Sequence, residues 1–68
     1  MGPVPSLSKS ALQELRRIYV KHLLEVFASP ETQELLERGC IKGRFDERAF
    51  IVAAVTPVGR AALDAHDA

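Results

Sequence analysis

Two histidines and one cysteine are the side chains best suited to metal binding or nucleophilic chemistry in this chain of 68 residues. His22 and His66 lie far apart in the sequence, with Cys40 between them. No two of these residues have the short spacing that zinc ligands use, and no motif brings a serine and an aspartate to a histidine. A domain this small also has little room for a substrate cleft. We therefore expect no metal, no cofactor and no catalytic site, and hence a protein that is not an enzyme.

Cys40 lies between Gly39 and Ile41, next to an apolar run. A single cysteine excludes an intramolecular disulfide bond. A reactive thiol needs a neighbour that lowers its pKa, and the sequence places no histidine close to this one. We expect Cys40 to be a small buried hydrophobic residue.

The charges balance, with nine basic and nine acidic residues. Proteins that bind DNA usually carry a positive excess, because neutralisation of phosphates supplies most of their affinity. A role in DNA binding therefore needs a local basic patch, for which the second half of the chain offers four candidates: Arg38, Lys42, Arg44 and Arg48. The chain has no run of about 20 apolar residues and no signal-peptide pattern, so we expect a cytoplasmic protein without membrane contact.

The first element that the sequence predicts is a long helix. Residues 1–7 include two prolines, a glycine and a serine, and we expect them to be a flexible lead-in to a single domain of residues 8–68. Apolar residues then recur at three- and four-residue spacing, which predicts a helix that begins at Ser8 or Ser10 and ends near Ala28.

A second, shorter helix is predicted from Pro30 to Arg38. Ser29 is a suitable N-cap, proline suits the first helical position, and Gly39 can take the left-handed conformation that ends a helix. This helix also contains three carboxylates: Glu31, Glu34 and Glu37.

Residues 40–45 and 49–55 predict an antiparallel hairpin, because both runs are rich in β-branched, aromatic or apolar residues and a short polar segment joins them. Alternation places Phe50, Val52 and Ala54 on one face of the second strand and Ile51, Ala53 and Val55 on the other. Both faces are apolar, so we expect either a helix on each side or contact with another molecule.

A final helix is predicted from Pro57, with Thr56 as its N-cap. Gly59 is a poor helix former near the start of this helix, which indicates a close approach of another segment of backbone. The sequence therefore predicts an α+β domain with two helices, an antiparallel β-hairpin and a short C-terminal helix.

The residues Glu34-Leu35-Leu36-Glu37-Arg38-Gly39-Cys40-Ile41, followed by a polar hairpin and by Val55-Thr56-Pro57-Val58-Gly59-Arg60-Ala61-Ala62-Leu63, form a known pattern. The pattern resembles the C-terminal half of winged-helix DNA-binding domains of bacterial or phage-type regulators, and it covers residues 31–63. The resemblance implies a helix that enters the major groove and a wing that contacts phosphates. It places Thr32, Gln33 and Arg38 on the groove side, and Lys42, Arg44 and Arg48 on the wing.

The sequence also departs from this pattern. The carboxylates of the second helix repel phosphate, only two helices fit before the hairpin where a full winged helix has three, and the turn is acidic at Asp46 and Glu47. Two hypotheses therefore stand side by side. The first is a DNA-binding transcriptional regulator that uses the four basic residues. The second is a protein–protein interaction module, either a homodimer or the binder of another protein, with these contact residues: Tyr19, Leu23, Phe50, Ile51 and Val55.

Overall fold

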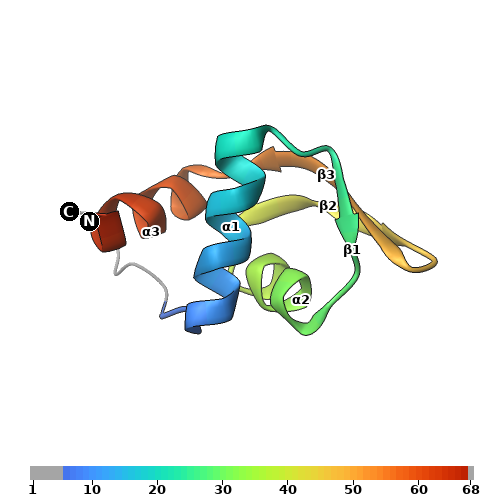
Figure 1. Cartoon of the computed structure of the whole chain (residues 1–68), viewed down its shortest axis with the longest axis horizontal. Coiled ribbons are helices and arrows are strands. Elements are labelled where there is room, and N and C mark those ends of the chain that lie inside the picture. The colour runs from blue at the N-terminus through green and yellow to red at the C-terminus, as the bar shows by residue number, and fades with distance from the viewer. Residues whose placement is uncertain (1–5, 68) are drawn as a thin grey trace.

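The computed structural model describes residues 6–67, which form a three-stranded antiparallel sheet and three helices (Figure 1). The helices are α1 (Lys9–Lys21), α2 (Pro30–Glu37) and α3 (Pro57–Asp67), and the strands are β1 (Glu25–Phe27), β2 (Ile41–Asp46) and β3 (Ala49–Val55). The strand order is β1-β3-β2, so β3 lies in the middle of the sheet. The predicted α+β class is confirmed.

The lead-in predicted for residues 1–7 lies mostly outside the described residues. Its last residue, Leu7, packs against the hydrophobic core, so the predicted lead-in is too long at this end. Ser8 follows as the N-cap of α1, where its hydroxyl accepts a hydrogen bond from the backbone N–H of Ala11.

Helix α1 ends well before the predicted boundary near Ala28. His22 adopts the left-handed conformation with φ 52°, and the backbone N–H of Leu23 donates to the carbonyl of Ile18, which closes the last turn at Lys21. The prediction of a helix through Ala28 is therefore wrong.

Strand β1 occupies the segment that the sequence assigned to the end of the first helix. Its three residues pair with β3, so the predicted two-stranded hairpin gains a third strand. Val26 points into the core and is only 5% exposed, and the strand is also held by the hydrogen bond from the Ala28 N–H to the Arg48 carbonyl. Tertiary pairing and this burial outweigh the local helical periodicity.

Helix α2 begins at Pro30, as predicted, and ends at Glu37, one residue before the predicted end, and both of its ends are capped. Ser29 and Thr32 form a capping box, in which each side chain bonds the backbone N–H of the other residue. At the other end Gly39 has φ 75°, and its N–H donates to the Leu36 carbonyl while the Cys40 N–H donates to the Leu35 carbonyl. This pair of bonds is the Schellman motif, which satisfies the last carbonyls of a helix.

A β-bulge in β3 changes which side chains face the core. The register on its two sides consists of these pairs: Ile41–Val55, Lys42–Ala54 and Gly43–Val52. Ala53 is therefore an extra residue, and it shifts the alternation by one. Val55 consequently packs against the core, on the same face as Phe50, and Ala54 is exposed. The prediction that placed Ala54 on the same face as Phe50, and Val55 on the opposite face, is wrong for this reason.

Helix α3 begins at Pro57, as predicted, and the residue before it is hydrogen-bonded to the segment that follows α2. The Thr56 hydroxyl donates to the Gly39 carbonyl and accepts from the Gly59 N–H, and the Thr56 N–H donates to the Cys40 carbonyl. A Cβ atom on Gly59 would lie 2.2 Å from the same Cys40 oxygen. The close backbone approach predicted at Gly59 is confirmed.

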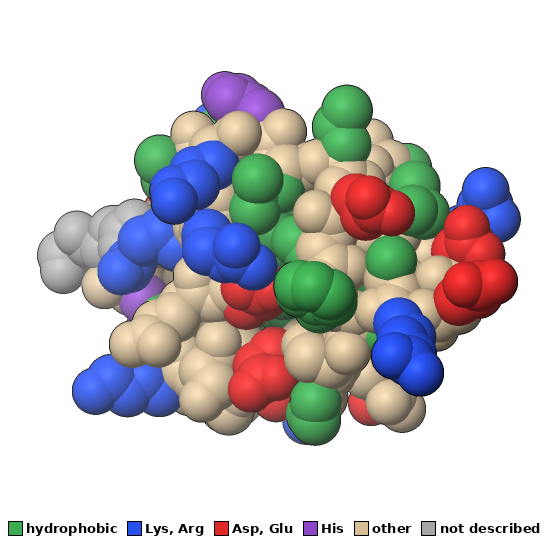
Figure 2. Space-filling model, turned by 45° about the vertical axis from the view of Figure 1, so that its right-hand side comes forward, with side chains coloured by type: hydrophobic (Ala, Val, Ile, Leu, Met, Phe, Trp, Pro, Cys, Tyr) green, Lys and Arg blue, Asp and Glu red, His purple; other side chains and the backbone are tan. Residues whose placement is uncertain are grey.

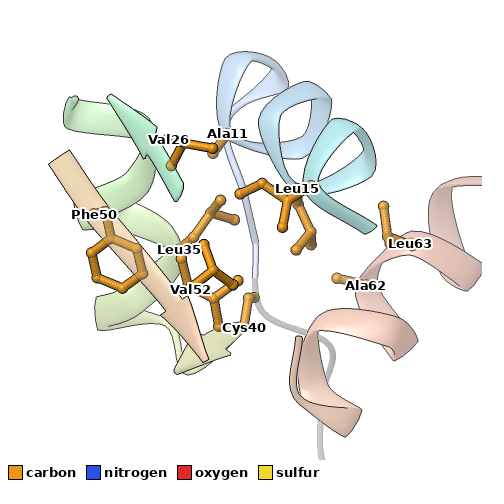
Figure 3. Packing of buried hydrophobic residues seen from close by; sticks show 11 residues of the cluster. Ala11, Leu15, Val26, Leu35, Cys40, Phe50, Val52, Ala62 and Leu63 are labelled. Carbon is orange, nitrogen blue, oxygen red and sulfur yellow. The ribbon is translucent and has the colours of Figure 1, made fainter. Parts of the chain in front are cut away.

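The hydrophobic core lies between the helices and one face of the sheet (Figure 3). Its residues come from all three helices, all three strands and Cys40: Ala11, Leu15, Ile18, Val26, Leu35, Cys40, Ile41, Phe50, Val52, Ala62 and Leu63. The opposite face of the sheet, called here the outer face, carries Glu25, Ile51 and Arg44 in one row across the three strands. Glu25 and Arg44 are exposed on either side of the half-buried Ile51.

Candidate partner-binding surface

The four basic residues predicted to contact DNA do not lie at one place. Lys42 and Arg44 alternate with core-facing residues on β2 and so share the outer face of the sheet. Arg38 caps α2 before this strand begins, whereas Arg48 lies in the turn beyond its other end. A strand of six residues is about 20 Å long, so Arg38 and Arg48 are separated by the length of β2.

Helix α2 presents a surface that differs from the one the resemblance implies. Thr32, a predicted groove contact, is fully buried, and its hydroxyl is engaged with Ser29. Gln33 is exposed but its amide donates to the carboxylate of Glu37. The prediction that Thr32 contacts DNA is therefore wrong, because Thr32 is part of the cap of α2.

Three of the five predicted partner contacts come together. Tyr19 and Leu23, from α1 and the loop after it, line a hollow of about 230 Å³ together with Val55 and the bulged end of β3. The guanidinium of Arg60 lies 5.6 Å from the centroid of the Tyr19 ring, a cation–π distance that holds the ring in place. Ile51 lies elsewhere, on the outer face of the sheet.

Phe50 cannot contribute to a surface, because it is 0% exposed and is the largest fully buried side chain. Its ring meets the ring of Phe45 edge to face, with centroids 4.9 Å apart. The prediction that Phe50 contacts a partner is therefore wrong, and Phe50 is a core residue.

The most exposed large apolar side chains lie on or next to β1. Phe27 is 85% exposed and Leu24 is 73% exposed. Figure 2 shows hydrophobic side chains exposed between charged side chains of both signs on the side of the molecule where β1 and the hairpin lie. Neither residue was predicted as a contact, because the segment that holds them was expected to be the end of the first helix. The β-branched and aromatic pair Val26-Phe27 was the signal that could have indicated a strand.

The outward edge of β1 has no strand beside it among residues 6–67, because β1 is an outer strand of the sheet. The Leu24 carbonyl accepts from Val52 and the Ala28 N–H donates to Arg48, so alternate residues of β1 direct their backbone groups toward β3. Glu25 and Phe27 therefore direct their N–H and C=O groups away from the sheet. These four groups have no hydrogen-bond partner among residues 6–67.

Phe27 is one of the residues that line a hollow of about 330 Å³. Its charged lining residues are Arg17 of α1, Glu25 of β1 and Arg48 of the turn. Arg17 is already paired with Glu14 at 2.8 Å, whereas Arg48 has no ion pair within the described part of the chain. The surface at β1 thus combines an aromatic ring, free backbone hydrogen-bonding groups and a guanidinium without an anion. We call this set of features the β1 edge.

Cys40 is fully buried, in agreement with its prediction as a core residue. Burial raises the pKa of its thiol, and the effect outweighs the opposing attraction of Arg38. Within residues 6–67 no three His, Cys, Asp or Glu side chains are grouped so that they could hold a metal ion.

Comparison with models of protein families, with curated proteins and with solved structures finds no match for this chain. None of the helices in the described residues is both long enough and apolar enough to cross a membrane.

Proposed function

We propose that this chain is a non-enzymatic protein-interaction module that binds a protein partner along the β1 edge. The observation that carries the proposal is the exposure of Phe27, at 85%, on an outer strand whose outward backbone groups have no partner among residues 6–67. Burying an aromatic or large aliphatic side chain is worth about 1.5–3 kcal/mol, which a partner that covers Phe27 can gain.

The two edges of the sheet differ in a way that supports this proposal. Edge strands of soluble proteins usually carry charged side chains, which discourage pairing with another chain. On β2 the outer-face positions are charged, with Lys42, Arg44 and Asp46. On β1 the exposed Phe27 pairs with Ala49, and it therefore lies in the same row across the sheet as Asp46 of β2.

Addition of an extended segment to a free sheet edge is a common mode of protein recognition. Backbone hydrogen bonds then supply affinity, and pockets for alternate side chains supply specificity. Leu23 lines both the hollow next to Phe27 and the hollow next to Tyr19. We propose that the predicted contacts Tyr19 and Leu23 extend the surface that the β1 edge begins.

The proposal is tested by selecting binders from a displayed library of peptides on the purified chain. We expect the selected peptides to bind the Phe27→Ser variant at least about tenfold more weakly, and to shift NMR signals of β1. The matched control is Val58→Ser, which removes an exposed apolar side chain from α3 and should leave binding unchanged. Peptides that bind wild type and Phe27→Ser equally would contradict the proposal.

DNA binding is a second candidate function, supported by the winged-helix resemblance and by the shared outer face of Lys42 and Arg44. On this hypothesis the chain binds duplex DNA with an affinity that falls as salt rises, and Arg44→Glu with Arg48→Glu abolishes binding. The same titration with Glu47→Gln serves as the control. No binding at low salt would exclude this candidate.

A further inference from the structure

The structure favours one particular occupant of the β1 edge. We infer that the partner is a second copy of this chain, and that the two β1 strands pair antiparallel about a twofold axis through Val26. The pairing joins two three-stranded sheets into one sheet of six strands, in the order β2-β3-β1-β1-β3-β2. This inference rests on the proposed function, because it names the partner of the same surface.

The hydrogen-bonding pattern of the free edge selects the register. The outward groups belong to Glu25 and Phe27, so a second copy offers the same four groups in the opposite direction. Pairing Glu25 with the partner's Phe27, and Phe27 with the partner's Glu25, matches every N–H with a C=O and forms four hydrogen bonds.

Registers displaced by two residues match fewer groups. One displacement brings Leu23 opposite Phe27, but the Leu23 N–H is already bonded to Ile18. The other brings Ser29 opposite Glu25, but the Ser29 N–H is already bonded to the Thr32 hydroxyl. The register centred on Val26 is therefore the one that uses all of the free groups.

Charge complementarity favours the same register. Glu25 and Phe27 lie on the outer face, so in this register the partner's Glu25 lies beside Phe27. The hollow next to Phe27 is also lined by Arg17 and Arg48. The incoming carboxylate thus meets Arg48, which lacks an ion pair in the described residues, and the twofold axis repeats the contact.

Association of this kind stops at two copies. The dimer consumes both β1 edges and leaves the two β2 strands at the outside of the six-stranded sheet. The exposed charges of β2 oppose further edge-to-edge pairing. Because three residues a side form a short interface, we expect a weak dimer whose population depends on concentration.

Sedimentation equilibrium of the purified chain, from about 10 μM to about 1 mM, measures the association. We expect a monomer–dimer equilibrium without larger species. In a sample that mixes ¹³C-labelled with unlabelled chains, we expect an intermolecular NOE between the two Val26 Hα protons, which face each other closely in this non-hydrogen-bonded pair.

Charge reversal at the interface gives a test that is specific to this register. Glu25→Arg alone and Arg48→Glu alone should each raise the dimer dissociation constant about two- to fivefold, and the double variant should restore it. Glu37→Arg, on the exposed surface of α2, is the control for adding a positive charge. Phe27→Lys should raise the constant about tenfold or more, whereas Val58→Lys should not change it. Circular dichroism establishes that each variant is folded.

The outcomes separate this inference from the proposed function. A monomer throughout the concentration range, with peptides that still depend on Phe27, would overturn self-association and leave the interaction module intact. A dimer that Phe27→Lys and the charge reversals do not affect would overturn the register and the use of the β1 edge together. A dimer restored by the double variant, with the Val26 contact, supports the inference.

Discussion

Gly59 occupies a position where a larger residue meets the backbone of another segment. A Cβ atom there would lie 2.2 Å from the Cys40 carbonyl oxygen and 3.1 Å from the Val55 side chain. Gly43 is similarly confined, since its Cβ would lie 2.0 Å from the Ile51 oxygen. Gly39 differs from both, because nothing lies within 4 Å of its Cβ and only its φ of 75° requires glycine.

The variant Gly59→Ala tests the close approach of Gly59 to Cys40, because the two possible effects on the free energy of unfolding have opposite signs. Helix propensity alone predicts that alanine stabilises α3 by about 1 kcal/mol. The clash with Cys40 predicts the opposite, a loss of about 1–3 kcal/mol in the free energy of unfolding, because neither backbone segment can move freely. Urea denaturation followed by circular dichroism distinguishes the two. Ala61→Gly, at an exposed position of the same helix, calibrates the propensity, and a more stable Gly59→Ala variant would refute the close approach.

At the level of elements, a carboxylate joins the start of α1 to the middle of α2. Glu34 accepts hydrogen bonds from the Ser8 backbone N–H at 2.7 Å and from the Ser8 hydroxyl at 2.9 Å. The backbone hydrogen bond, followed by the hydroxyl bond, lowers the pKa of Glu34 below its ordinary value. Ser8 also caps α1, so a single residue connects the two helices.

This link predicts a pH dependence of stability. Because the folded pKa of Glu34 is lowered, its contribution is fully present above the ordinary carboxyl pKa of about 4.3 and is lost as the pH falls through the lower folded value. Glu34→Gln should therefore be less stable than wild type near neutral pH, and the difference should shrink on acidification. Thermal melts at several pH values measure it, with Glu31→Gln as control; a difference that does not change with pH would contradict the link.

The elements also show which features local sequence determines. The caps at Ser29 and Thr56 and the left-handed Gly39 were predictable, because each is specified by a residue within one helical turn. Strand β1 was not predicted, because residues 25–27 continue the apolar periodicity of α1, which outweighed the β-branched and aromatic pair Val26-Phe27, and they become a strand by pairing with β3. The bulge at Ala53 was not predicted for a similar reason, since a bulge is defined by how β3 pairs with β2.

For the whole molecule, the small core makes stability sensitive to single substitutions. Leu15→Ala removes a fully buried side chain at a cost of about 2–5 kcal/mol, and a chain of this length has a total stability of roughly 3–10 kcal/mol. We expect a large fall in the urea midpoint, measured at low protein concentration. Leu24→Ala makes the same chemical change at a 73% exposed position and should alter stability by no more than about 0.5 kcal/mol. Equal midpoints for the two variants would contradict the assigned core.

The candidate site was only partly predictable at this scale. Tyr19, Leu23 and Val55 were expected as contacts, and the fold brings them to one hollow. Phe27 was not expected, because its exposure depends on the position of β1 at the edge of the sheet. Phe50 was wrongly predicted as a contact, because alternation divides the residues of a strand between two faces but does not show which face the helices cover.

The bulge at Ala53 has a consequence for changes in chain length. Removal of this one residue places Val52 and Ala54 next to each other and turns the pairs Gly43–Val52 and Lys42–Ala54 into consecutive steps of an ordinary ladder. Every remaining side chain keeps the face that it has now. Insertion of a residue at the same place leaves two unpaired residues of β3 between these two pairs and enlarges the irregularity of the ladder. This strand can therefore lose a residue more readily than it can gain one.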